Sequence, residues 1–481
     1  MKNTISYDRK LLWQLVFGLI AMGVGMRLTG GMAFAAIYVC ILLSFAKNRT
    51  EWLLYFLLMT IAMTNSNSLV IPKSGTFGLI ARSVHFLIAG VMGLQLVAQR
   101  NSRMGTPLLA ILLYISYMAC ISWYGWMPLL SYLKLLLFTV MYLGFYSVAN
   151  AAATQRGVRV EKLRSVFLSF AVFFMLGSVC LIPFPGLGTM SAEVFYRQFG
   201  YYPEGGLFMG MALHSQSLGG MAAAFAAILL ADMLFSLRRW DKLYIVLLLC
   251  APILVYKTGS RTAMGTLLIT VAFICLVFMG ARGVKSKWRG RALNTLIGGA
   301  ICMGLLLFTT PQMRQAVAKF VLKYASDDQE LVVSYENVIA TRQGSMEEQL
   351  ENFKDSPVIG HGFQVSKAMK AMTVYSWKQL LSAPVEKGVW VTAILEEGGA
   401  LGLLLFVIVS TTIGFLLWSR EAYTALAVFV SLLVSNLGEF TMFSMTAVGG
   451  ITWVLVFVGV TLDAQRVRLR MSEAWTVFNI D

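Results

Sequence analysis

Long runs of apolar residues, separated by short polar segments, make up most of the chain. One such run, at residues 263–280, reads AMGTLLITVAFICLVFMG and contains no charged side chain. A membrane-spanning helix needs about 20 apolar residues in succession, whereas a membrane barrel strand alternates polar and apolar positions. The pattern therefore predicts an all-α polytopic membrane protein with about fourteen transmembrane helices. We expect them near residues 11–28, 31–46, 52–66, 77–97, 107–124, 129–149, 165–182, 212–235, 243–256, 263–281, 295–310, 389–417, 422–437 and 442–463.

Two longer stretches interrupt the apolar runs, a shorter one at residues 183–211 and a longer one at residues 311–388. The longer stretch has helical periodicity of its own, and Arg342 lies at the edge of an apolar helix face. A connection of this length inside a membrane protein is too large to be a simple turn. We therefore expect a membrane domain over 1–310, a large helical loop over 311–388, and the last three spans with a tail over 389–481.

Composition supports this class and narrows the chemistry. Hydrophobic residues make up 58% of the chain and charged residues only 13%, against about 25% charged in a typical soluble protein. The six cysteines all lie in apolar runs, which is typical of packing residues rather than of a metal site. We expect neither a bound metal nor a cofactor.

Positive charge is concentrated in alternate connecting segments, which sets the expected orientation. About 23 of the 39 cations fall in the segments that are cytoplasmic if the N-terminus is cytoplasmic. This bias predicts that both termini are cytoplasmic and that the 311–388 loop is periplasmic. The net charge of +16 is then explained by topology, and we expect no nucleic-acid partner.

The segment VYKTGSRTAMGTLL, at residues 255–268, places Lys257 and Arg261 at the mouth of a span with no acidic residue in the stretch. One interpretation is that the two cations anchor a helix end among lipid headgroups. The other is that they bind an anion, since a guanidinium pairs bidentately with phosphate. The sequence around the pair leaves both interpretations open.

Four motifs, in order over roughly residues 190–410, resemble those of the bacterial O-antigen ligase and polymerase family. Gly210, His214, Leu218 and Gly219 match the first motif, and Arg342 and Pro357 keep the spacing of the third. The four segments are GMALHSQSLGG at 210–220, TGSRTAM at 258–264, TRQGSMEEQLENFKDSPVIGHGF at 341–363 and EKGVWVTAILEEGGALGLLLF at 386–406.

This resemblance implies a membrane glycosyltransferase that uses undecaprenyl-pyrophosphate-linked sugars in the bacterial cytoplasmic (inner) membrane. Arg261 and Arg342 would hold one pyrophosphate between them, and His214 or Glu386 would accept the proton of the attacking hydroxyl. The remaining substrate-binding candidates are Lys257, Arg197 and Gln216. The transfer would be metal-independent, with a lipid-linked oligosaccharide and membrane lipid as partners and a chain-length regulator and a flippase as associated proteins.

One departure from the family pattern favours a polymerase over a ligase. Ligases commonly carry a histidine where the long loop re-enters the membrane, and this chain has Gly388 there, preceded by Glu386 and Lys387. A ligase that transfers the glycan to lipid A core is the alternative within the family. A transporter or flippase is the alternative of another class, and it would predict inverted repeats and ionisable residues at mid-membrane.

The expected topology can be tested by labelling introduced cysteines from outside the cell. A cysteine placed at Asp327 should react with a membrane-impermeant thiol reagent, whereas one placed at Lys285 should not, because these positions fall on opposite sides of the membrane. The reverse pattern would contradict the orientation, since the proposed substrate would then face the wrong compartment.

Overall fold

The computed structural model describes most of the membrane-embedded chain and part of the long loop. The described residues are 7–29, 61–62, 65–71, 87, 89–91, 106–153, 160–191, 207–235, 241–280, 335–367, 387, 389–438, 440–443 and 448–478. The expected spans near 31–46, 52–66, 77–97 and 295–310 lie wholly or largely outside these residues.

Helices account for nearly all of the described structure, with two short strands that pair antiparallel between Thr189 and Phe208. The elements are α1 (Arg9–Thr29), α5 (Thr106–Ser122), α6 (Pro128–Ala153), α7 (Val160–Ala171), a π-helical turn (Val172–Leu176), α8 (Gly177–Leu181), α9 (Pro185–Gly188), β1 (Thr189–Met190), β2 (Leu207–Phe208), α11 (Ser215–Phe235), α12 (Lys242–Lys257), α13 (Arg261–Gly280), α16 (Tyr335–Asp355), α19 (Trp390–Ser419), α20 (Tyr423–Ser435) and α21 (Val448–Phe478).

Six segments among the described helices are long and apolar enough to cross a membrane. They are Pro128–Ser147, Val160–Leu181, Ser215–Phe235, Arg261–Gly280, Trp390–Ser419 and Val448–Val467. The chain is therefore a multi-pass helical membrane protein. The total of about fourteen spans stays a prediction, because several expected spans fall outside the described residues.

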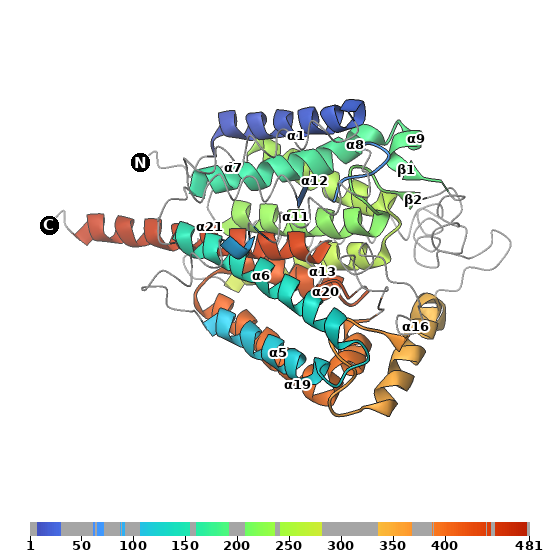
Figure 1. Cartoon of the computed structure of the whole chain (residues 1–481). Coiled ribbons are helices and arrows are strands. Elements are labelled where there is room, and N and C mark those ends of the chain that lie inside the picture. Colours follow the sequence, from blue (N-terminus) through green and yellow to red (C-terminus); the bar gives the residue numbers. More distant parts are fainter. Residues whose placement is uncertain are drawn as a thin grey trace.

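The helices form one bundle with two distinct ends (Figure 1). We call the end where α11, α13 and α19 begin the His214 end, and the end where α7 and α20 begin the Arg164 end. The start of α1 lies at the Arg164 end, where the Ser165 hydroxyl donates to the Asp8 carbonyl at 2.9 Å. The α9–β1–β2 segment and α16 both lie at the His214 end (Figure 1).

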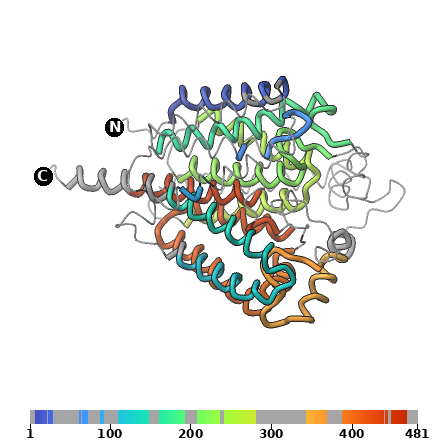
Figure 2. Tube along the Cα trace, viewed as in Figure 1, coloured from blue at the N-terminus to red at the C-terminus, as the bar shows by residue number. Residues whose placement is uncertain are grey.

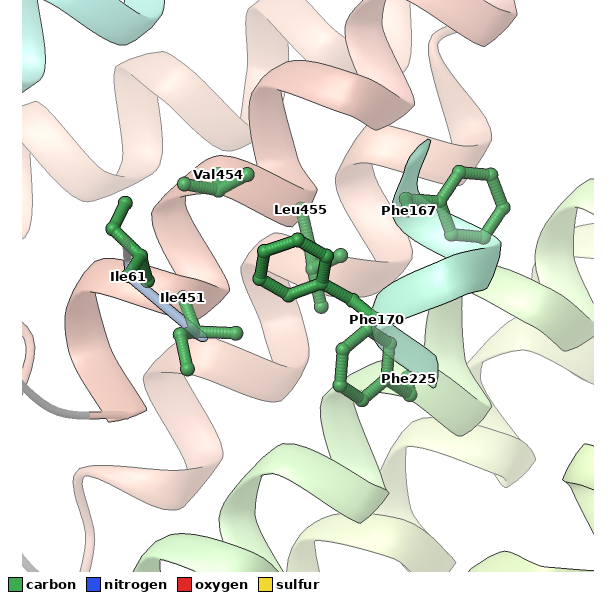
Figure 3. Close-up of a pocket in the computed structure, with 7 residues that line it drawn as sticks. All are labelled: Ile61, Phe167, Phe170, Phe225, Ile451, Val454 and Leu455. Atoms are coloured by element: carbon green, nitrogen blue, oxygen red, sulfur yellow. The ribbon is translucent and has the colours of Figure 1, made fainter. Parts of the chain in front are cut away.

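Apolar packing fills the middle of the bundle. A void of about 10 Å³ remains between α7, α11 and α21, and each of its lining side chains is apolar (Figure 3). These residues are Ile61, Phe167, Phe170, Phe225, Ile451, Val454 and Leu455. A cavity this small, without a polar partner, does not hold a water molecule. The centre of the bundle is therefore a dry core rather than a site.

A buried ion pair holds the Arg164 end together. The guanidinium of Arg164 binds Asp232 through two hydrogen bonds of 3.1 and 2.9 Å, and neither side chain is exposed. The Tyr244 hydroxyl donates to the same carboxylate at 2.7 Å. These three side chains come from α7, α11 and α12, so the cluster fixes three helices that are otherwise joined by apolar contacts.

Removing the cation of this cluster should destabilise the protein strongly. Arg164→Met leaves the Asp232 carboxylate buried without its countercharge, which costs about 3–5 kcal/mol for a buried pair. We expect a clear fall in the thermal unfolding midpoint of the detergent-solubilised protein. Arg9→Met is the control, because Arg9 is exposed at the start of α1 and exposed substitutions usually change stability by less than about 0.5 kcal/mol. Equal midpoints for the two variants would contradict the role of the pair.

Candidate functional site

The first motif forms the turn into α11, with His214 at the helix start. Helix α11 begins at Ser215, and the Gln216 amide donates to Nδ1 of the half-buried His214 ring at 3.3 Å. The imidazole thus satisfies one of the amides that a helix leaves without an internal partner at its first turn. In a neutral imidazole whose Nδ1 accepts, Nε2 carries the proton. This geometry suits His214 to donate a hydrogen bond to a ligand rather than to accept a proton.

The second motif packs directly against the first. Lys257 is the last residue of α12, and Arg261 is the first residue of α13. A Cβ built on Gly219 of α11 would lie 2.8 Å from the Cβ of Ala263 and 3.0 Å from Oγ1 of Thr258. The absence of a side chain at residue 219 therefore lets the start of α13 approach α11 closely.

A small polar cavity lies where these helices meet. Its volume is about 20 Å³, enough for one water molecule, and none of its lining residues is acidic. The lining residues are Gln216, Gly220, Ser260, Thr262, Ala263, Ser435, Thr441 and Val448. Three of the elements that contribute to it, α11, α13 and α21, do so with their first turns. Helix N-termini carry partial positive charge, so their convergence favours an anion near this point.

The two cations of the second motif, Lys257 and Arg261, lie in different electrostatic environments. Lys257 is exposed in the last turn of α12, where the helix dipole already favours a positive charge. Arg261 is half-buried at the first position of α13, where the dipole opposes a positive charge. An anion near the start of α13 would offset that cost, whereas a helix anchor would gain nothing from this position.

The third and fourth motifs meet at a break in α19. Residue Gly399 interrupts the helix with φ 64° and ψ −167°. In an unbroken helix the amides of Ala400 and Leu401 would bind the carbonyls of Glu396 and Glu397. Here Ala400 donates to the Pro357 carbonyl at 2.8 Å, and Leu401 donates to that of Val358 at 3.2 Å.

The same loop also satisfies the carbonyls that the break exposes. The His361 amide donates to the Glu396 carbonyl at 3.0 Å, and the Gly362 amide donates to the Glu397 carbonyl at 2.9 Å. Four loop hydrogen bonds therefore replace two helical ones. Figure 2 shows this stretch, in orange, turning back from α16 to the start of α19.

Glycine is required on both sides of this contact. Gly399 adopts a conformation that is open essentially to glycine alone, and a Cβ there would overlap the Val358 carbonyl oxygen. Gly360 has φ 66°, and its added Cβ would lie 2.5 Å from the backbone of Glu397. The glycines of the third and fourth motifs thus fit one another.

A buried cluster of charges surrounds the break. The ammonium of Lys387 lies 2.8 Å from Glu396 and 2.8 Å from Glu397, and it donates to the Val365 carbonyl at 2.6 Å. Asn352 of α16 donates to the other Glu396 oxygen at 2.8 Å. The cluster ties α16, the loop after it and α19 into one unit.

Lys387 stays protonated at neutral pH. Burial alone would lower its pKa, but the charges of Glu397 and Glu396 outweigh burial, so the pKa of Lys387 lies above its ordinary value. A pKa that is raised on folding contributes stability that is present at neutral pH and is lost as the pH rises through the raised value. The Lys387 cation of the cluster is therefore present at physiological pH.

The site residues expected from the sequence divide into two groups. His214, Gln216, Lys257 and Arg261 lie together at the His214 end. The backbone of Arg342 belongs to α16, but its side chain lies outside the described residues, as do Arg197 and Glu386 entirely. The shared grip of Arg261 and Arg342 on one pyrophosphate therefore stays a prediction.

The sequence alone does not identify Lys387 as the partner of Glu396 and Glu397. Nothing in the spacing of residues indicates which cation binds these two acids. The one available signal was a lysine a few residues before two adjacent acids at the start of an apolar span.

Comparison of the sequence with known protein families and with curated proteins gives no match. The fold and the site therefore define the class, a multi-pass helical membrane protein with a polar, acid-free cavity at one end of its bundle.

The fit between loop and helix break can be tested at Gly399. Gly399→Ala should destabilise the protein by at least about 1–3 kcal/mol, the cost of the conformation alone, with the overlap on Val358 adding to it. The measurement is thermal unfolding in detergent. Gly414→Ala is the matched control in the same helix, because nothing lies within 4 Å of an added Cβ there. Since alanine is favoured over glycine inside a helix, the control should be neutral or slightly stabilised. A Gly399 variant as stable as the control would be inconsistent with the observed break.

Proposed function

We propose that the protein is a polysaccharide polymerase of the bacterial inner membrane. It would transfer an undecaprenyl-pyrophosphate-linked glycan to a lipid-linked acceptor sugar on the periplasmic face. The observation that carries this proposal is the convergence of three helix N-termini on an acid-free polar cavity beside Arg261. The cavity itself has room for one water molecule, so the diphosphate would lie outside it, next to Arg261, where the helix N-termini favour an anion over a neutral sugar.

The resemblance of the motifs supplies the reaction, and the geometry supplies roles for individual residues. A hydroxyl oxygen of the acceptor sugar attacks the anomeric carbon, and the bond from that carbon to the pyrophosphate oxygen breaks. The leaving pyrophosphate retains the electron pair and gains negative charge, which Arg261 and the helix N-termini stabilise. The hydroxyl proton passes to a base.

Of the two candidate bases, Glu386 is the better one. The Nδ1 atom of His214 already accepts a backbone hydrogen bond, so the ring is suited to donate from Nε2 to a phosphate or sugar oxygen. Gln216 lines the cavity and can donate through its amide. We therefore assign both residues to substrate binding and assign proton transfer to Glu386.

The alternatives predict different outcomes in one experiment. The chromosomal gene is deleted in the bacterium that carries it, and the surface polysaccharide is analysed by gel electrophoresis. Loss of a polymerase leaves single repeat units on the acceptor. Loss of a ligase leaves long polymer on undecaprenyl pyrophosphate, and loss of a flippase leaves unpolymerised repeat units in the cytoplasmic leaflet.

The role of Arg261 is tested by a substitution that keeps its charge. Arg261→Lys loses the bidentate contact, worth about 1.5–3 kcal/mol, so polymer formation should fall roughly 10- to 100-fold while the protein still inserts into the membrane. Polymer length is measured in the deletion strain complemented with each variant. Arg420→Lys is the control, because Arg420 is exposed in the turn between α19 and α20 at the Arg164 end. If the Arg261→Ala variant still forms a normal amount of polymer, Arg261 serves only as an anchor among lipid headgroups.

A further inference from the structure

The His214 end consists of two halves that contact each other through a few residues. The cavity half comprises the first turns of α11, α13 and α21 with the turn at 436–442. The junction half comprises the loop at 357–366 and the break in α19. The chemistry proposed above needs both halves in register, because the first two motif segments lie in the cavity half and the last two meet in the junction half.

Lys387 contacts both halves. Its ammonium binds Glu396, Glu397 and the Val365 carbonyl in the junction half at 2.6–2.8 Å. Its own carbonyl accepts from the Phe440 amide in the cavity half at 3.2 Å. One residue therefore joins the junction half through its side chain to the cavity half through its main chain.

The turn that receives this contact is itself held rigidly. The buried Asn436 side chain accepts from the amides of Thr441 and Met442 at 2.7 and 2.8 Å. The Asn436 carbonyl accepts from the Trp390 amide at 3.2 Å. A second contact between the halves thus lies three residues after Lys387, and a displacement of residues 387–390 would be passed on to the turn.

The turn also shapes the polar cavity. Thr441 lines it, and Gly438 lies so close to Thr262 that an added Cβ would overlap the Thr262 side chain. Thr262 follows Arg261 in the first turn of α13 and lines the same cavity. One path from Lys387 to the cavity therefore passes through this turn.

The cluster around Lys387 contains equal numbers of positive and negative side chains. Two carboxylates, Glu396 and Glu397, face Lys387, and the ammonium of Lys134 donates to the neighbouring Gln364 carbonyl at 3.1 Å. Each of these ionisable side chains is buried. A balanced and enclosed cluster leaves no excess charge for a ligand, so its contribution is geometric.

We propose that Lys387 is a positioning residue that holds the junction half in register with the polar cavity at the ends of α11 and α13. The inference rests on the function proposed above, which needs the junction half to stay in register with the polar cavity next to Arg261. A change in that register should lower the rate of transfer without abolishing binding of the lipid pyrophosphate.

The test separates positioning from charge balance. Lys387→Met removes the cation alone, whereas Lys387→Met/Glu397→Gln removes one charge of each sign and restores balance. Lys367→Met is the matched control, because Lys367 lies in the same half and pairs with Asp355 at 4.0 Å with both side chains about 60% exposed. Each variant is assayed for polymer formation in the deletion strain and, after purification, for binding of undecaprenyl pyrophosphate.

A second measurement reports the register of the two halves without using activity. Spin labels are attached at Val358 in the junction half and at Leu437 in the turn of the cavity half, both of which are exposed. The distribution of distances between the labels is recorded by electron spin resonance in detergent. We expect a narrow distribution for the unsubstituted protein and for Lys367→Met.

The balanced double variant decides the question. We expect it to fold, to bind undecaprenyl pyrophosphate, to form polymer roughly 10- to 100-fold more slowly and to give a broadened distance distribution. Recovery of polymer formation with a narrow distribution would overturn the proposal, because charge balance alone would then suffice. A double variant that fails to fold would also overturn it and assign the cluster to folding alone. If the unsubstituted protein makes no polymer, the proposed function fails, and the spin-label distances still decide whether Lys387 sets the register.

Discussion

The need to satisfy every backbone amide and carbonyl inside a membrane protein explains the arrangement of the His214 end. Helix α19 is broken at Gly399, and a break in a membrane helix is tolerated only where other groups bind the freed backbone. The loop at 357–362 supplies those groups through four hydrogen bonds. The loop cannot be displaced without leaving amides and carbonyls unsatisfied, so it is part of the membrane domain although it belongs to the long loop in sequence.

This constraint also explains why particular residues occur in the third and fourth motifs. Gly360 and Gly399 permit the backbones of the loop and the helix to approach, and the adjacent Glu396 and Glu397 bind Lys387. The described glycines and charged residues of the third and fourth motifs thus form two sides of one contact. The first two motifs, by contrast, place Gln216, Ser260 and Thr262 around a polar cavity, and His214 and Arg261 lie close to these residues in sequence.

The sequence was sufficient for the helices and insufficient for the contacts between them. Long apolar runs predicted each of the six described membrane-spanning segments, because hydropathy is a local property. The pairing of Arg164 with Asp232 joins residues 68 positions apart, and no local pattern encodes it. His214, Gln216, Lys257 and Arg261 all lie at helix ends on one side of the bundle, and their roles in a site stay a prediction. The role of Lys387 depends on the break in α19. The sequence does not reveal this break, because the apolar run continues through it.

Arg261 occupies the first position of α13, where the helix dipole opposes a positive charge. A cation at the first residue of a helix opposes the helix dipole, whereas Lys257, four residues earlier, complements the dipole of its own helix. The cavity beside Arg261 adds the positive ends of α11 and α21 and offers hydroxyl and amide groups without an acid. These features favour negative charge near the start of α13. Their coincidence at one point, where separate motifs meet, is the physical reason for proposing an anion site there.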